Sequence, residues 1–178
     1  SNASRGLGDV YKRQLYCDSI DSKKRKSTIL LLNIILNSLL KWFAPILSFT
    51  TEEIYRLLFK DSKSVHLEKF LNFPNNFENE KLYQKWLELI KIRNICNISI
   101  EEKRTNKEIG SSLEADLNIH LDKKLEEITK NIDFSELCIT SKAEISFKEN
   151  SETSAQTTKA NGTKCDLCWK ISENACYR

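Results

Sequence analysis

The sequence lacks the residue patterns that most enzymes need for chemistry. It contains no glycine-rich phosphate-binding loop, no nucleophile elbow and no convincing constellation of paired carboxylates. The two histidines, His66 and His120, have no cysteine or aspartate at metal-ligand spacing, and we expect both at the surface. The sequence therefore offers no candidate active site.

A strong charge of one sign is also missing. The chain carries 28 Lys and Arg against 25 Asp and Glu, a net charge of +3. Any contact with nucleic acid must then come from locally placed cations and not from a broadly basic surface. The 178 residues, 40% of them hydrophobic, suit one ordinary globular domain or two small ones.

Long apolar runs and a secretory signal are absent as well. The strongest apolar run, Ile29 to Phe43, contains polar interruptions and is shorter than the roughly 20 residues that span a bilayer. Ser1-Asn2-Ala3 resembles the scar of a removed tag, and Asp9 to Gln14 resembles a translated transposon end. We therefore expect residues 1–14 to be a tag and a non-native leader, and the protein to be cytoplasmic.

Residues 15–107 predict a helical bundle. A helix is expected from Lys23 to Lys41, because its polar positions form only a narrow stripe, and Pro45 ends it. Thr50-Thr51-Glu52-Glu53 resembles a capping box, in which Thr50 caps a helix from Glu52 to Lys60 and Glu53 reaches back.

The longest predicted helix runs from Glu80 to Arg104. Its buried seam has a spacing of three and four residues. The seam comprises Leu82, Trp86, Leu89, Arg93, Cys96 and Ile100. Arg93 is unusual in such a seam, and it either pairs with a buried carboxylate or points outward at a phosphate or base.

Other cations allow two interpretations. Lys103, Arg104 and Lys107 lie at the end of the long helix, where they favour the helix dipole without RNA, but they are also well placed for backbone phosphates. Lys23 to Lys26 is either a solvated helix end or an RNA contact.

Residues 108–147 predict a small α+β subdomain. Apolar residues alternate with polar ones from Leu113 to Leu121, the pattern of a half-buried strand. A helix is expected at 122–131, followed by two short strands at 137–141 and 143–147. Polar residues without periodicity at 148–163 predict a flexible linker.

The cysteines are unevenly distributed. Cys165 and Cys168 form a C-x-x-C half-site that could hold Zn²⁺, and Cys176 supplies a third thiol, so 164–178 predicts a zinc module that ends before its fourth ligand. The alternative is a mobile tail of ordinary thiols. The scattered thiols, Cys17, Cys96 and Cys138, are expected to be reduced.

Several strings resemble one family. Leu15 to Asp18, followed by Trp42 to Ile54 with its Ala-Pro-Ile-Leu and Thr-Glu-Glu elements, is similar to the anticodon-binding bundle of class I synthetases for aliphatic amino acids. The combination of Arg93, Asn97, Glu101, Arg104, Lys107, Ile109-Gly110 and Ser112 to Ala115 resembles bacterial isoleucyl-tRNA synthetases in particular. Lys164-Cys165 with Cys168-Trp169 resembles their C-terminal zinc module.

This resemblance implies a mainly α fold: an anticodon-binding helical bundle, a small α+β junction subdomain and a partial zinc knuckle. It implies binding of isoleucine tRNA at the anticodon stem-loop, with Arg93, Arg104, Lys107 and Trp169 as RNA contacts and Cys165, Cys168 and Cys176 as metal ligands. The catalytic part that uses ATP is missing from the chain, and we expect a monomer that does not bind DNA or membranes. The alternatives are a valyl- or leucyl-type synthetase, or a helical protein-interaction module with a zinc tail.

Overall fold

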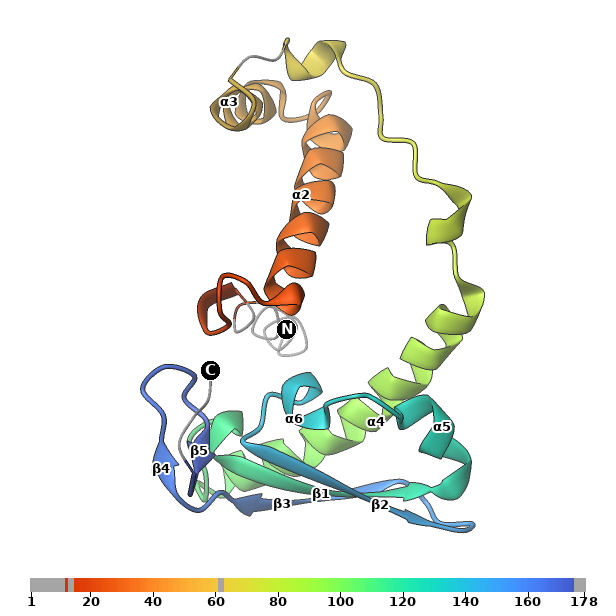
Figure 1. Cartoon of the computed structure of the whole chain (residues 1–178), viewed down its shortest axis with the longest axis vertical. Coiled ribbons are helices and arrows are strands. Elements are labelled where there is room, and N and C mark those ends of the chain that lie inside the picture. Colours follow the sequence, from red (N-terminus) through yellow and green to blue (C-terminus); the bar gives the residue numbers. More distant parts are fainter. Residues whose placement is uncertain (1–11, 13–14, 61–62, 175–178) are drawn as a thin grey trace. The chain divides into compact units, whose positions relative to one another are not determined.

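A computed structural model describes residue 12, residues 15–60 and residues 63–174. The chain divides into two compact units (Figure 1). The helical unit comprises Ser19–Glu78, and the mixed unit comprises Ser1–Asp18 with Asn79–Arg178. None of the described helices is long and apolar enough to cross a membrane. The predicted leader, 1–14, lies outside the described residues except for Lys12.

The helical unit is built on two helices. Helix α2 spans Lys23–Phe43 and helix α3 spans Ser48–Leu58, which confirms the predicted helices with small shifts at their ends. Two 3-10 turns follow, η1 at Val65–Leu67 and η2 at Asn75–Phe77. The buried centre of this unit consists of Leu40, Ala44, Tyr55 and Val65.

The predicted capping box at the start of α3 is wrong. The helix begins at Ser48, two residues before the predicted cap, and Thr51 directs its hydroxyl back to the Leu47 carbonyl at 2.9 Å. Glu52 instead binds η1: its Oε2 accepts from Ser64 Oγ at 2.8 Å and from the Val65 amide at 2.9 Å. The carboxylate therefore joins α3 to the following turn.

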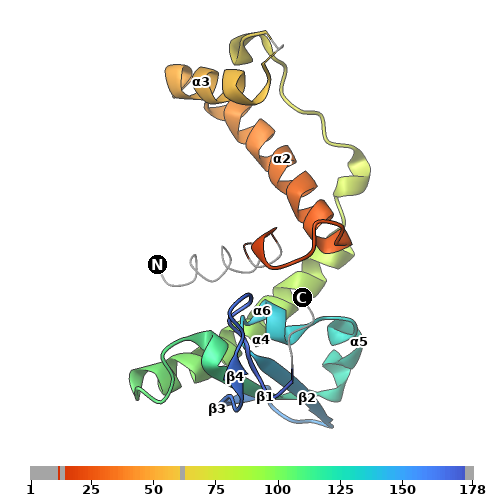
Figure 2. The same cartoon turned by 60° about the vertical axis from the view of Figure 1, so that its left-hand side comes forward.

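Helix α4 spans Glu80–Thr105 and is capped by Asn79, whose side chain accepts from the Leu82 amide at 3.0 Å. It lies along one face of a three-stranded sheet (Figure 1 and Figure 2). The residues that α4 buries there are Leu89, Ile92, Cys96 and Ile100. The predicted bundle of 15–107 is thus divided between the two units, because its last helix belongs to the core that contains the sheet.

The sheet has strand order β2-β1-β3. Strand β1 spans Ala115–Asp122 and shows strict alternation of buried and half-buried residues, as the sequence predicts. Strand β2, Lys142–Lys148, pairs parallel to β1, with Leu117 opposite Ala143. Strand β3, Ser154–Lys159, pairs antiparallel to β1.

Three predictions in this region are wrong. Residues 148–163 are not a linker throughout, because β3 lies within them and hydrogen-bonds to β1. The predicted strand at 137–141 is the end of helix α6, Phe134–Leu137, and a turn in which Ile139 has a φ of 58°. The predicted helix at 122–131 is reduced to a 3-10 turn, η4 at Lys123–Leu125, and the short helix α5 at Glu126–Thr129.

A two-stranded hairpin ends the described chain. Strands β4, Thr163–Lys164, and β5, Ile171–Ser172, pair antiparallel. Gly162 precedes β4 with a φ of +124°, and a Cβ at this position would lie 2.4 Å from the Ser172 backbone. Glycine is required there, since the two strands approach too closely for any side chain.

The Glu52 carboxylate, which joins α3 to η1, leads to a testable prediction about stability and pH. Hydrogen bonds from Arg56 and Ser64 lower the pKa of Glu52 from 4.5 to about 2. A lowered folded-state pKa stabilises the fold above pH 4.5, and this contribution is lost as the pH falls toward 2. Glu52→Gln should therefore lower the urea midpoint of the helical unit at pH 7, and the difference from the parent chain should shrink as the pH falls from 4.5 to about 2.

The measurement is urea unfolding at several pH values, followed by the amide signals of α3. A difference between the parent and Glu52→Gln that stays constant from pH 7 to pH 2 would contradict the prediction.

Candidate nucleic-acid interface

The C-terminal hairpin of the mixed unit closes a tight turn around two cysteines. The Trp169 amide donates to the Cys165 carbonyl at 2.8 Å, and the Cys165 amide donates to the Lys170 carbonyl at 2.9 Å. Trp169 has a φ of 62°, a left-handed conformation that reverses the chain directly after Cys168. We call residues 165–170 the knuckle.

The knuckle has the donor chemistry of a thiolate metal site. Cys165 is half-buried and Cys168 is 4% exposed. The spacing of two residues between them suits two of the four ligands of a tetrahedral Zn²⁺ ion. Within the described part of the chain no group of three metal-binding side chains is present. The third predicted ligand, Cys176, lies outside the described residues.

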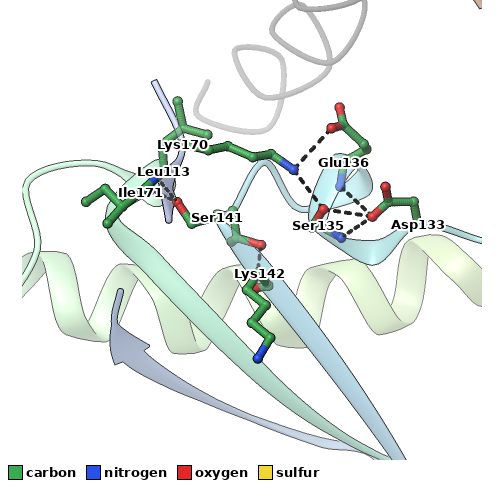
Figure 3. A network of polar contacts seen from close by, with 9 residues as sticks. Leu113, Asp133, Ser135, Glu136, Ser141, Lys142, Lys170 and Ile171 are labelled. Atoms are coloured by element: carbon green, nitrogen blue, oxygen red, sulfur yellow. Dashed lines mark hydrogen bonds and ion pairs between the residues drawn. The ribbon is translucent and has the colours of Figure 1, made fainter. Parts of the chain in front are cut away.

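A network of polar contacts holds the knuckle against the rest of the mixed unit (Figure 3). Lys170 Nζ lies 3.1 Å from Glu136 Oε1 and donates to Ser135 Oγ at 2.8 Å. The Ile171 amide donates to Ser141 Oγ at 2.6 Å, and Ser141 Oγ in turn donates to the Leu113 carbonyl. The hairpin is thereby fixed both to α6 and to the residues that enter β1.

Helix α6 is itself fixed in place. Asp133 caps it by accepting from the Ser135 and Glu136 amides. Burial alone would raise the pKa of Asp133, but the hydrogen bonds from Ser135 and Glu136 and the nearby charge of Lys170 hold it below its ordinary value. The capping carboxylate is thus ionised at neutral pH, which favours the N-terminal end of the helix.

A cavity of about 590 Å³ lies beside the knuckle. Trp169 is 60% exposed at this cavity, and Lys164 Nζ lies 5.9 Å from the centre of its ring. Cys17 Sγ donates to the Leu167 carbonyl at 3.3 Å on the same wall. The remaining lining residues are Lys12, Tyr16, Ser111, Ser112, Leu113, Ile139 and Cys168. An exposed indole, a cation and a hollow are together suited to a planar ring with an attached phosphate.

A second group of cations lies at the C-terminal end of α4. Arg104 Nη1 pairs with Glu101 at 2.6 Å, and Lys103 pairs with Glu108 at 2.8 Å. The hydrogen bond from Lys103 holds the pKa of Glu108 below its ordinary value. Exposed Lys107 has a φ of 59° and lines a hollow of about 440 Å³ together with Arg104. The structure therefore brings Arg104 and Lys107 together at one hollow, and their contact with RNA stays a prediction.

Arg93 occupies a different position. It is 7% exposed, and its Nε donates to the Leu137 carbonyl at the end of α6 at 2.9 Å. Its partner is thus a carbonyl, whereas the sequence analysis expects a carboxylate, a phosphate or a base. The Arg93 side chain thus lies in the interior of the mixed unit, where its guanidinium joins α4 to α6, and it is set apart from the exposed side chains of Arg104 and Lys107.

The other sequence-predicted residues are dispersed. Cys96 and Cys138 lie in the core of the mixed unit, where the hydrogen bond between their thiols and burial raise the pKa of Cys138. His66 hydrogen-bonds to the Ser48 carbonyl, and His120 hydrogen-bonds to the Ser146 hydroxyl. In the basic segment from Lys23 to Lys26, the Lys26 side chain forms an ion pair with Asp21 at 3.2 Å.

The sequence analysis does not single out Lys170 or Glu136, and it names Lys164 only as part of the string that resembles a zinc module. Lys170 lies two residues after Cys168, and this nearness to the C-x-x-C pattern is the sequence signal that points to it. Its partner Glu136 lies in a separate helix, α6, so no local sequence pattern predicts the ion pair between them.

Comparison with known proteins identifies the class. Residues 5–120 match the family described as the anticodon-binding domain of tRNA ligase. The chain belongs to this family.

The similar curated proteins are isoleucine–tRNA ligases. The ligase of Pelagibacter ubique is 59% identical over 170 residues, which cover 96% of this chain and 19% of the relative. Those of Bartonella henselae and Agrobacterium fabrum are each 34% identical, over 93% and 92% of this chain and 18% of each relative. The chain thus spans about a fifth of the length of the curated relatives it matches, and these matches extend beyond the family domain into the sheet and the knuckle.

The position of Arg93 predicts a structural effect. Replacing it by methionine removes the donor to the partly buried Leu137 carbonyl, which should lower the free energy of unfolding by about 1–3 kcal/mol. Arg104→Met is the matched control on the same helix, because that side chain is 45% exposed and its loss should change stability by only about 0.5 kcal/mol. Urea denaturation followed by circular dichroism measures both, and equal effects of the two substitutions would contradict the assignment.

Proposed function

We propose that this chain is the region of an isoleucine–tRNA ligase that binds the anticodon stem and loop of isoleucine tRNA. The observation that carries the proposal is the match of residues 5–120 to the anticodon-binding family, together with isoleucine–tRNA ligase relatives over more than nine-tenths of the chain. The exposed indole and the cations of the mixed unit supply the chemistry that such a contact needs.

In the whole ligase, isoleucine and ATP form an adenylate, and the isoleucyl group then passes to the 3′ end of the tRNA. We assign this chemistry to parts of the ligase outside the matched fifth, because the sequence offers no catalytic constellation. The role of this chain in protein biosynthesis is to recognise the RNA, in the cytoplasm and as a monomer.

The RNA would be bound by two kinds of contact, base stacking and phosphate binding. Trp169 would stack on an unpaired base, since a base presents a flat face to any aromatic ring, and Lys164 beside it would meet the attached phosphate. Arg104 and Lys107 would bind backbone phosphates of the stem, which position the RNA without reading its sequence.

A zinc ion would hold the knuckle closed. Cys165 and Cys168 would be two of its ligands and Cys176 a third, each as a thiolate. The metal would supply cross-linking of the turn and no step of the reaction. Its effect on RNA binding would be indirect, through the conformation of Trp169.

The proposal predicts different salt dependence for the two kinds of contact. Trp169→Ala should weaken binding by about 1–3 kcal/mol at every salt concentration, because a stacking contact is lost. Arg104→Gln and Lys107→Gln should each weaken binding at low salt and reduce the slope of log K against log salt by about 1.

Filter binding of isoleucine tRNA from low to moderate salt measures these effects, with valine tRNA as the competitor. Lys123→Gln is the control for loss of one positive charge, since that lysine is 61% exposed and pairs with Glu149 on the other end of the sheet. Equal retention of both tRNAs would oppose the isoleucine assignment, and retention of neither would refute RNA binding.

The zinc proposal predicts one metal ion per chain. Cys165→Ser or Cys168→Ser should abolish its retention after dialysis, as measured by plasma mass spectrometry. Cys17→Ser is the matched control, because serine can still donate to the Leu167 carbonyl. Full retention of zinc in the Cys168 variant would exclude the knuckle as its site.

A further inference from the structure

We propose that Lys170 and Glu136 are positioning residues of the RNA interface, which hold the knuckle so that Trp169 is presented to a base. This inference rests on the proposed function, and it concerns a pair of side chains that do not themselves contact the RNA. The pair joins the turn that carries Trp169 to helix α6 in the body of the mixed unit (Figure 3).

The knuckle needs such an anchor because its hairpin is small. Strands β4 and β5 contain two residues each. In the described part of this hairpin, Cys168 is the buried apolar residue, whereas Leu167 and Trp169 are 52% and 60% exposed. A turn of this size cannot be oriented by apolar burial alone, so its direction depends on the polar contacts at its base.

Lys170 is suited to this role because both its backbone and its side chain contribute contacts. Its carbonyl accepts from the Cys165 amide and so closes the knuckle. Its side chain reaches out of the knuckle to Glu136 and Ser135. The same residue therefore fixes the internal shape of the turn and its attachment to α6, one position after Trp169.

Burial distinguishes this ion pair from ordinary surface pairs. The Lys170 and Glu136 side chains are 17% and 11% exposed, whereas those of the Lys142–Glu144 pair are 65% and 61% exposed. Exposed pairs contribute little to any geometry, while a partly buried pair with a second hydrogen bond resists displacement. The anchor is rigid in turn, because Arg93 from α4 donates to the last residue of α6.

The sign of one substitution separates positioning from direct contact. If Lys170 bound a phosphate, Glu136→Gln would remove a competing negative charge and tighten RNA binding. If the pair positions the knuckle, the same substitution loosens the turn and weakens binding by roughly tenfold, because preorganisation of Trp169 is lost. The two roles thus predict opposite changes for a variant that makes the protein more positive.

The experiment compares four variants of the full chain: Glu136→Gln, Lys170→Met, Lys170→Arg and Lys123→Met. We expect the first two to lose about tenfold in affinity for isoleucine tRNA while zinc content and circular dichroism stay unchanged. Lys170→Arg should recover most of the affinity, because it restores the ion pair. Lys123→Met, with the same charge change as Lys170→Met in an exposed pair, should have a much smaller effect.

A readout without RNA tests the positioning directly. In a Trp42→Phe and Trp86→Phe background, Trp169 is the remaining tryptophan, and its fluorescence anisotropy should decay faster in the Glu136→Gln variant. Unchanged Trp169 mobility, or tighter RNA binding by Glu136→Gln, overturns the inference. Failure of the parent chain to bind any tRNA overturns the proposed function instead, and the anisotropy still decides whether the pair positions Trp169.

Discussion

Burial of strand β1 against helix α4 is the constraint on which the mixed unit depends. Leu117, Ile119 and Leu121 are at most 1% exposed, and they meet the apolar side of α4. The same strand pairs with β2 on one side and β3 on the other. The Leu113 and Ala115 carbonyls, just before and at the start of β1, accept hydrogen bonds from Ser141. Because the Ser141 hydroxyl also accepts from the Ile171 amide, the position of β1 determines where the C-terminal hairpin is attached.

The interface is held by a different kind of interaction from the core. Apolar burial fixes α4 and the sheet, but it is non-directional and cannot aim a single side chain on a short hairpin. Hydrogen bonds can, since their geometry is restrictive. Lys170 contacts α6, and Ile171 contacts Ser141. These hydrogen bonds therefore fix the orientation of the turn that carries Trp169 on the stable core of the mixed unit.

The sequence predicted the parts of the fold with strong periodicity. The alternation around Leu117 identifies β1 and its buried face. The seam of α4 identifies the helix and the burial of its second half, but its first two members, Leu82 and Trp86, are 50% and 41% exposed. Strand β3 was missed because its inward residues are small or polar: buried Thr157 faces α4, where its hydroxyl bonds Ser99 at 2.8 Å. In the candidate site, Trp169 and the cysteines are local motifs, whereas Glu136 becomes relevant only through a contact that folding creates.

Electrostatics also explains why a chain of small net charge can serve an RNA contact. Arg104 lies 2.6 Å from Glu101, so a phosphate must displace that carboxylate before it gains the full interaction. Such pairing weakens the binding of any polyanion, because sequence-independent affinity for RNA comes mostly from cations that are free to bind phosphates. Under the proposed function, selectivity would come from Trp169 and the shape of the adjoining cavity, which suit an unstacked base better than a duplex. Cations that are already paired with carboxylates, together with an aromatic ring held by hydrogen bonds, would thus suit recognition of a loop in a defined RNA.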